Sequence, residues 1–254
     1  MSLAPGATEM LFAAGAGDRI VATVEHSDEP PAARHIPRIG GAGAIDVERV
    51  VALRPDLAVV WPGGNNPAQT AQLERLGIPI YRNQVDTLEA LPDSLRRLGR
   101  LAGTQDVAEA AAREIEARLE RLENRRGSAE RPSVLLQVWN RPLYTVGGRH
   151  LMSDALRLCG ARNVFGDLRE PGPAVQIEAV IARDPDMIIA IGAPEAAREW
   201  LAEWRRFGKL RAVRTGRLLE FTDRRLSRLG PSAVEATEAL CALIDSHRTP
   251  AKAP

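Results

Sequence analysis

The stretches IDVERVVALRPD at residues 45–56 and VQIEAVIARDPD at residues 175–186 decide the fold of this chain. Aligned without a gap, they pair Glu48 with Glu178, Ala52 with Ala182, Pro55 with Pro185 and Asp56 with Asp186. Each stretch predicts a short amphipathic helix that ends at Pro-Asp, because proline cannot continue a helix. An apolar run follows each copy, as is typical of a buried parallel strand. Such a junction also recurs by chance, but these matches in register favour an internal duplication and two similar halves.

A single long helix is predicted between the two copies, over Thr104–Arg126. This segment contains no Pro or Gly and is rich in Ala, Glu, Arg and Leu, which are strong helix formers. Apolar residues at positions 107, 111, 115, 119 and 122 form one stripe at helical spacing, and Glu114 and Arg118 form an i,i+4 pair. At 1.5 Å per residue the helix would extend roughly 30 Å, enough to connect two lobes. Gly127-Ser128 is expected to end it.

On either side of this helix, predicted strands and helices alternate. The expected strands are 20–24, 57–61, 78–81, 133–138, 187–191 and 218–221, and the expected helices are 8–16, 47–53, 67–76, 88–102, 150–159, 177–182, 196–204 and 231–247. Alternation of this kind predicts an α/β fold with parallel sheets and right-handed crossovers. We therefore expect an N-terminal lobe at 1–103, a linker helix at 104–127 and a C-terminal lobe at 128–254. Ligands of open α/β sheets bind beyond the carboxyl ends of the strands.

The composition is that of an ordinary soluble globular protein, with 44% hydrophobic and 26% charged residues. A net charge of +1 without a dense basic run argues against a nucleic-acid partner. No apolar run approaches the roughly 20 residues that span a bilayer. The first residues lack a signal-peptide pattern, and Ser2–Pro5 resembles the tail of a strand, so an earlier strand and an export signal are expected to be missing from this chain. Cys159 and Cys241 have no CxxC spacing and are either two buried thiols or one disulfide.

Several stretches, taken in order, resemble the periplasmic cobalamin-binding proteins. They are Ala4–Phe12, Ser27–Pro31, Leu53–Leu57, Trp61–Asn65, Leu76–Pro79 and residues 137–165. The resemblance implies a type III binding-protein fold, in which two Rossmann-like lobes are joined by one long helix and close only slightly on a ligand. It also implies a periplasmic or extracytoplasmic location, a protein that is monomeric when free, and delivery of a corrinoid to an ABC permease and its ATPase.

The same resemblance assigns roles to four residues. Glu48 and Glu178 correspond to glutamates that contact arginines of the permease, and Cys159 and Cys241 correspond to a disulfide pair. Equivalent carboxylates on two lobes would suit a two-fold-symmetric partner, and complementary charge would guide the encounter. The alternative for the glutamates is a pair of ordinary solvated helix residues.

The resemblance also implies a set of ligand contacts in the inter-lobe cleft. These are Pro5, His26, Ala42, Trp61, Gly64, Val138, Trp139, Gly172, Arg224 and Arg225. A corrin ring is a flat, largely apolar plate that aromatic side chains suit. Only Trp61 aligns with an aromatic residue of the family's ligand cage. At other aromatic positions of the cage this chain has His26, Ala42, Val138 and Gly172. Trp139 is therefore expected to supply a replacement aromatic contact.

Each contact has a simpler alternative. Trp61 and Trp139 would instead be packing residues, His26 a surface histidine rather than a neighbour of a cobalt or iron centre, and the two arginines solvated charges. Two rival functions follow. One is a ferric siderophore or haem carrier, for which Arg224 and Arg225 would balance an anionic ligand. The other is an enzyme, which Gly63-Gly64-Asn65 supports weakly because it lacks phosphate-loop spacing and no catalytic motif accompanies it. No bound cofactor and no metal site are expected.

Overall fold

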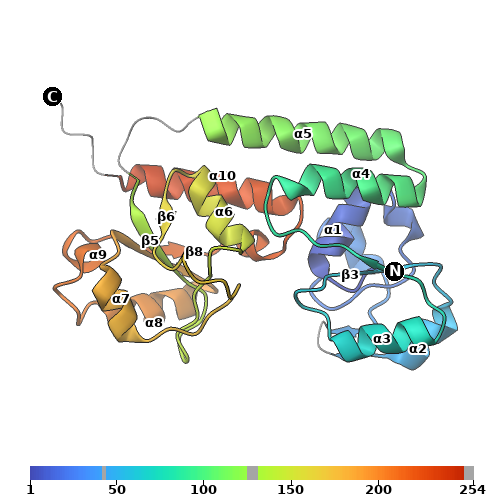
Figure 1. The fold of residues 1–254 in the computed structure, drawn as a ribbon, viewed down its shortest axis with the longest axis horizontal. Coiled ribbons are helices and arrows are strands. Elements are labelled where there is room, and N and C mark those ends of the chain that lie inside the picture. Colours follow the sequence, from blue (N-terminus) through green and yellow to red (C-terminus); the bar gives the residue numbers. More distant parts are fainter. Residues whose placement is uncertain (42–43, 125–130, 249–254) are drawn as a thin grey trace. The chain divides into compact units, whose positions relative to one another are not determined.

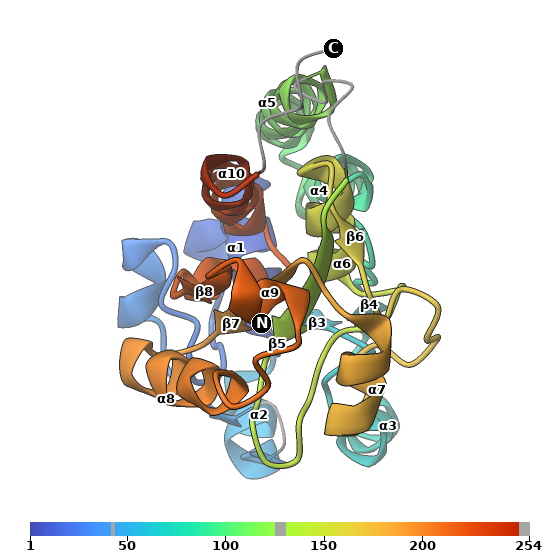
Figure 2. The ribbon, with the colours of Figure 1, turned by 90° about the vertical axis from the view of Figure 1, so that its left-hand side faces the viewer.

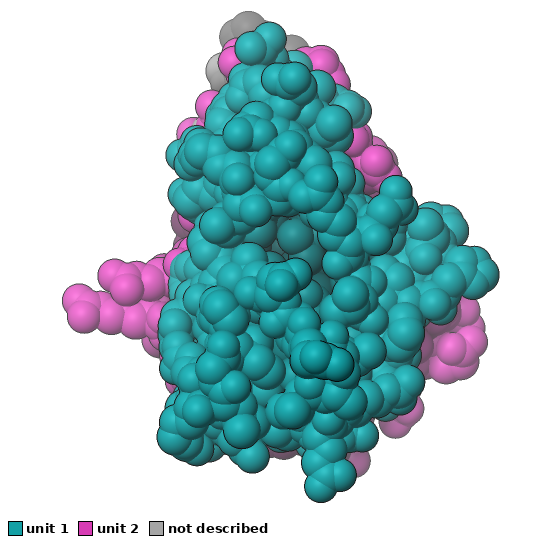
Figure 3. Space-filling view, turned by 90° about the vertical axis from the view of Figure 1, so that its right-hand side faces the viewer, with its two compact units in different colours: residues 1–85, 89–117, 228–232 teal, residues 86–88, 118–227, 233–254 magenta. Residues whose placement is uncertain are grey.

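The computed structural model describes residues 1–41, 44–124 and 131–248, which divide into two compact units. The first unit contains residues 1–85, 89–117 and 228–232, and the second contains residues 86–88, 118–227 and 233 onward (Figure 3). The chain therefore crosses between the units several times, and one crossing lies inside a helix. Within the described ranges, no helix is both long and apolar enough to cross a bilayer.

The first unit carries one short parallel pair of strands with helices around it (Figure 1). Its elements are α1 (Pro5–Ala13), β1 (Gly40–Gly41), β2 (Ala44–Ile45), α2 (Val47–Leu53), β3 (Ala58–Val60), α3 (Pro67–Arg75), β4 (Ile80–Arg82), α4 (Ala90–Ala102) and the first part of α5 (Gln105–Asn124). Strands β3 and β4 are parallel, with Ala58 opposite Ile80. Residues Met1–Ala4 run beside β3, because Leu3 N–H donates to the carbonyl of Val59 over 2.9 Å. All residues of β3 are buried, which makes it the centre of this unit's core.

The predicted strand Ile20–Val24 is wrong in detail. This segment is extended and lies between two neighbours, but it forms only an isolated parallel bridge between Thr23 and Arg38 and one hydrogen bond from Ser2 N–H to the Ala22 carbonyl. A ladder of consecutive pairs is absent there. The helix predicted from residue 8 begins earlier, at Pro5, because proline suits the first turn of a helix.

The second unit is built on a four-stranded parallel sheet with strand order β6-β5-β7-β8. Its elements are β5 (Ser133–Gln137), α6 (Leu151–Leu158), β6 (Arg162–Asn163), α7 (Ile177–Arg183), β7 (Met187–Ile191), α8 (Pro194–Trp204), α9 (Arg211–Arg214), β8 (Leu218–Phe221) and α10 (Ser232–Ser246). Figures 1 and 2 both show the strands between α6 and α10 on one side and α7 and α8 on the other. Every residue of β5 and β7 is buried, as expected for central strands covered on both faces. The predicted α/β class with parallel sheets is confirmed.

The predicted long helix is present, but it packs differently from the prediction. Helix α5 is continuous from Gln105 to Asn124, and the predicted final residues 125–126 and the break at 127–128 lie outside the described residues. Val107 is 53% exposed, whereas Ala108 and Ala112 are fully buried, so the apolar stripe is rotated by one residue at its start. Small residues allow α4 and α5 to pack closely at this point. A methyl group added at Gly99 of α4 would come within 2.3 Å of the Ala108 side chain of α5.

The predicted pair Glu114–Arg118 is also replaced by other contacts. Arg118 pairs with Glu238 of α10 at 2.8 Å and with Glu235 at 3.3 Å. The Glu238 carboxylate raises the pKa of Arg118. Arg118 therefore forms its ion pairs with residues distant in sequence rather than with Glu114 on its own helix.

The two repeat copies adopt the same local structure. Helices α2 and α7 each bury a single valine completely, Val50 in one and Val180 in the other. Each helix ends at a residue with left-handed backbone, Arg54 with φ 44° and Asp184 with φ 40°, directly before the shared proline. The proline disfavours right-handed helical geometry in the residue before it, so both helices stop at the same place.

Candidate functional site

In the first unit, Trp61 follows directly after β3, at the carboxyl end of the strand, and is partly exposed. Its indole ring lies against the next turn, because a methyl group added at Gly64 would come within 2.1 Å of the ring. Asn65 holds this turn, since its Oδ1 accepts from Trp61 N–H and its Nδ2 donates to the Leu3 carbonyl, both over 2.7 Å. Gly64 is therefore needed for the position of Trp61.

A buried chain of hydroxyl groups lies at the same end of this unit. Thr23 Oγ1 lies 2.7 Å from Thr8 Oγ1 and 2.9 Å from Ser27 Oγ, and Thr8 donates to Ser2 Oγ over 2.9 Å. All four side chains are at most 1% exposed. They fix the loop that presents His26, which is exposed and has a left-handed backbone with φ 64°. No sequence pattern singles out these hydroxyl residues, because single Ser and Thr residues are common in any loop.

Pro5 and Glu9 lie on α1. Pro5 is partly exposed at the first turn of the helix, whereas Glu9 is only 5% exposed and points inward. The Glu9 carboxylate accepts from Ser232 N–H over 3.2 Å and from Ser232 Oγ, and Arg228 lies 3.7 Å away. Burial raises the pKa of Glu9. Glu9 thus holds residues 228–232 against α1, a structural role that no sequence pattern indicates.

In the second unit, two aromatic residues form an exposed platform just beyond β5. Trp139 pairs with Tyr144 in an antiparallel bridge, and Tyr144 pairs in turn with Ala174. The backbone of Tyr144 therefore lies beside that of Trp139, with the Tyr144 N–H donating to the Trp139 carbonyl over 3.1 Å. Trp139 is 56% exposed and Tyr144 is 37% exposed. We call this pair the aromatic platform. Tyr144 is not apparent from the sequence, because its pairing depends on the turn at Arg141-Pro142.

Residues behind the platform are firmly packed. Trp139 contacts Trp200 of α8 edge to face, with ring centroids 6.0 Å apart. The buried Gln137 accepts from Trp204 Nε1 over 2.8 Å. Glu203 accepts from Asn140 over 2.9 Å, and this hydrogen bond lowers the pKa of Glu203. The exposed indole is therefore supported by a rigid layer rather than by a free loop.

The two candidate arginines have different environments. The Arg225 guanidinium donates to the Asp223 carboxylate from Nε over 3.0 Å and from Nη2 over 2.7 Å, and to Glu235 over 2.6 Å. Asp223 raises the pKa of Arg225, which is thus held in a structural ion pair. Arg224 is exposed and forms no ion pair within the described ranges. Arg224 is the arginine that remains available to a ligand.

The other candidate ligand residues of the second unit, Val138 and Gly172, have small side chains or none. Val138 is partly exposed and donates its N–H to the Tyr144 carbonyl over 3.0 Å. Gly172 is exposed, and a methyl group added there would meet no atom within 4 Å. Ala42 lies outside the described residues. Where the structure describes the chain, no cluster of three His, Cys, Asp or Glu side chains is placed to hold a metal ion.

Glu48 and Glu178 occupy equivalent positions in the first turns of α2 and α7, and both are exposed. Cys159 and Cys241 form a disulfide that joins the end of α6 to α10 inside the second unit. The predicted disulfide is confirmed.

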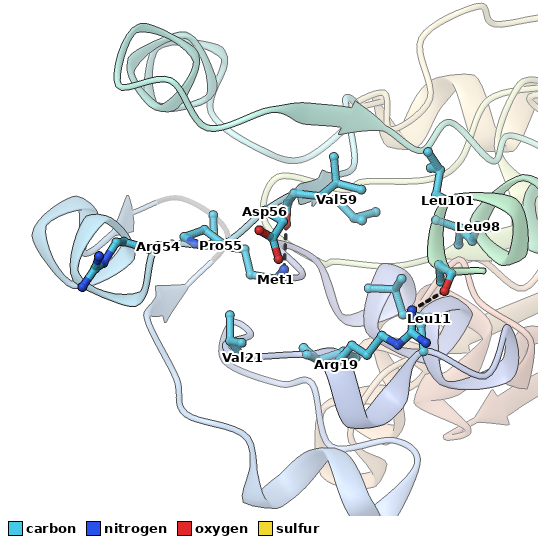
Figure 4. Close-up of a pocket in the computed structure, with 14 residues that line it drawn as sticks. Met1, Leu11, Arg19, Val21, Arg54, Pro55, Asp56, Val59, Leu98 and Leu101 are labelled. Carbon is cyan, nitrogen blue, oxygen red and sulfur yellow. Dashed lines mark hydrogen bonds between the residues drawn. The ribbon is translucent and has the colours of Figure 1, made fainter. Parts of the chain in front are cut away.

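A separate cavity of about 230 Å³ opens in the first unit, at the amino end of β3 (Figure 4). Residues 54–57 and Val59 line one side, Leu98 and Leu101 of α4 line another, and the Arg19 guanidinium reaches across to the Ala102 carbonyl. Trp61 lies at the opposite end of the strand. This cavity is therefore not part of the predicted ligand site.

Residues 1–224 match the family model described as periplasmic binding protein. The chain belongs to the periplasmic binding protein family. A vitamin B12-binding protein of Vibrio cholerae serotype O1 is 34% identical to this binding protein over 245 residues, which cover 95% of this chain and 87% of that relative. The family is a class of binding proteins rather than of enzymes.

Solved structures agree with this assignment. The crystal structure of the periplasmic vitamin B12 binding protein of Vibrio cholerae matches this binding protein with a TM-score of 0.86 and 33% identity, covering 97% of this chain and 96% of the other. A periplasmic haem-binding protein from Pseudomonas aeruginosa matches with a TM-score of 0.83 and 27% identity, covering 100% and 95%. The predicted family and fold class are confirmed.

Proposed function

We propose that this protein is the extracytoplasmic solute-binding subunit of an ABC importer and that it binds cobalamin or a related corrinoid. The aromatic platform carries the proposal. Trp139 and Tyr144 are exposed aromatic side chains, and Trp139 packs against Trp200; such side chains suit the face of a planar, largely apolar macrocycle. The relative at 34% identity is a vitamin B12-binding protein, and this supports a corrinoid as the macrocycle.

The remaining contacts follow from the geometry of each unit. Trp61 would contact the ligand from the first unit, with Pro5 and His26 beside it at the same end. In the second unit Arg224 would hold an amide or phosphate group of the ligand, while Arg225 keeps its loop in place. Gly172 and Val138 would leave room for a bulky ring. The ligand is cargo and leaves unchanged, so no catalytic residue and no resident cofactor are assigned.

Location and partners follow from the same proposal. The protein would act in the periplasm, as one N-terminal lobe, a linker helix and a C-terminal lobe, and would be monomeric when free. It would deliver its ligand to a membrane permease with its ATPase, with Glu48 and Glu178 contacting cationic residues of the permease. The disulfide supports an oxidising compartment.

Haem is the second candidate ligand, and two observations favour it. The haem-binding relative from Pseudomonas aeruginosa shares the fold. Exposed His26 and Tyr144 also carry side chains of the kind that bind haem iron. The two ligands differ in absorbance, so a spectrum of the loaded protein separates them.

The test is calorimetric titration with cyanocobalamin, cobinamide and haemin. Tight binding of either corrinoid, with haemin weaker, supports the proposal. We expect Trp139→Ala to weaken corrinoid binding about 10- to 100-fold, as for a central aromatic contact, and Trp139→Phe to retain most of the affinity. Leu101→Ala, which changes an exposed residue of α4, is the matched control and should have no effect. Binding of haemin alone, or of none of the three, would contradict the corrinoid assignment.

A further inference from the structure

Two exposed aliphatic side chains occupy the same position in the two repeat copies. Val51 on α2 is 43% exposed and Ile181 on α7 is 41% exposed, and each lies three residues after the glutamate of its copy. The alanine that follows each of them is also exposed. Residues at i, i+3 and i+4 share one face of a helix. Each unit therefore presents the same small surface, which consists of a glutamate, a β-branched residue and an alanine.

Helix packing does not require these surfaces to be apolar. Val50 and Val180 are fully buried on the opposite faces and already anchor α2 and α7 to their cores. A single exposed aliphatic residue on a protein is ordinary and needs no explanation. Neither Val51 nor Ile181 belongs to the core of its unit, yet both copies keep an exposed β-branched residue beside the same carboxylate.

The charges on these surfaces are also available. Within the described residues, neither Glu48 nor Glu178 forms a hydrogen bond or an ion pair through its side chain, although arginines near α7 are paired elsewhere. Arg183, for example, pairs with Asp167 at 2.7 Å. A free carboxylate next to an exposed aliphatic group matches a partner surface with a cation beside an apolar depression.

We infer that Val51 and Ile181 are apolar contacts for the permease, placed beside the two glutamates as equivalent anchors in the two lobes. This inference rests on the proposed function and adds to it the apolar part of the contact. Its partner is a two-fold-symmetric membrane protein, which offers the same cation and the same apolar depression twice.

The two kinds of group would contribute differently to binding. Charged groups at an interface mainly raise the association rate and make it depend on salt. Buried aliphatic contacts act mainly on the dissociation rate. Loss of Val51 or Ile181 should therefore shorten the lifetime of the complex and leave the salt dependence of association unchanged.

The test measures binding of the corrinoid-loaded protein to its cognate permease–ATPase complex in lipid nanodiscs, by biolayer interferometry at two salt concentrations. Burial of the exposed part of a valine or isoleucine predicts a roughly three- to tenfold weaker Kd for Val51→Ser and for Ile181→Ser. The double variant should show about the product of the two effects, because the sites are independent. Val107→Ser, at an equally apolar helix position that is 53% exposed, is the matched control and should bind as wild type.

Two further variants separate this inference from the proposed function. Glu48→Gln and Glu178→Gln should lower the association rate and reduce its salt dependence. If the glutamine variants weaken binding while Val51→Ser and Ile181→Ser do not, the apolar contact is wrong and the carboxylate contact stands. If wild type does not bind the complex at all, the proposed function itself is wrong. Unchanged corrinoid affinity and unchanged thermal unfolding of the serine variants show that the loss is not a folding defect.

Discussion

Removal of the Cys159–Cys241 disulfide should lower the stability of the second unit by about 2–4 kcal/mol. The bridge closes a loop with a sequence separation of 82 residues. For a loop of this length, the entropy removed from the unfolded chain corresponds to about 4.5 kcal/mol at 25 °C, and measured effects usually fall somewhat below this limit. With a urea m-value of about 2 kcal/mol per molar, the unfolding midpoint should fall by about 1–2 M.

The assay is urea unfolding of Cys159→Ala/Cys241→Ala, followed by tryptophan fluorescence. Three of the four tryptophans, at positions 139, 200 and 204, lie in the second unit, so the signal reports mainly on the part that contains the bridge. Wild type kept in reductant throughout the series is the second arm, because it retains both sulfur atoms and loses only the cross-link. Midpoints of both arms within about 0.2 M of oxidised wild type would refute the loop-entropy argument.

Two further stability predictions follow from single residues. Because burial raises the pKa of Glu9, the folded state binds a proton more readily than the unfolded state, and wild-type stability should fall as pH rises from about 4.5 through that pKa. Glu9→Gln cannot ionise, so its melting temperature relative to wild type should rise over this range; a difference that does not change with pH would contradict the assignment. Arg54→Gly should stabilise the protein by up to about 1 kcal/mol, because glycine adopts the left-handed conformation without strain. Asp184→Gly should gain less, since Asp184 also accepts from Arg211 N–H over 2.7 Å, and equal gains in chemical denaturation would show that this hydrogen bond contributes nothing.

Local signals made much of the fold predictable. Helix α2 has the predicted bounds, because Asp46 caps its start by accepting from Arg49 N–H and Pro55 follows its end. Strands β7 and β8 also have the predicted bounds. Strand β7 is a continuous apolar run, whereas β8 has one exposed residue, Glu220, among apolar ones. The disulfide and the family came from the resemblance rather than from these local patterns.

The errors arose where a distant neighbour decided the outcome. Helical spacing predicts Val107 on the buried stripe of α5, but the approach of α4 at Gly99 buries Ala108 instead. Arg118 binds Glu238, which is 120 residues away, rather than its helical neighbour. Neither preference is visible in a local window of sequence.

The positions of the two candidate tryptophans in the fold were predictable, but their neighbours were not. Residues after the strands were expected at the carboxyl ends, and Trp61 and Trp139 follow β3 and β5. The contribution of Tyr144 required knowledge of the bridge to Trp139. The difference between Arg224 and Arg225 likewise depended on which of the two reaches Asp223 and Glu235.

The cavity beside Leu98 and Leu101 has a consequence for the search for inhibitors. It opens at the amino end of β3, whereas Trp61 follows the carboxyl end, so under the proposed function a compound in the cavity and a ligand at Trp61 would be bound at the same time. A screen that scores displacement of vitamin B12 would overlook every such compound. A screen that scores the melting temperature would detect them, and would be the better choice for this pocket.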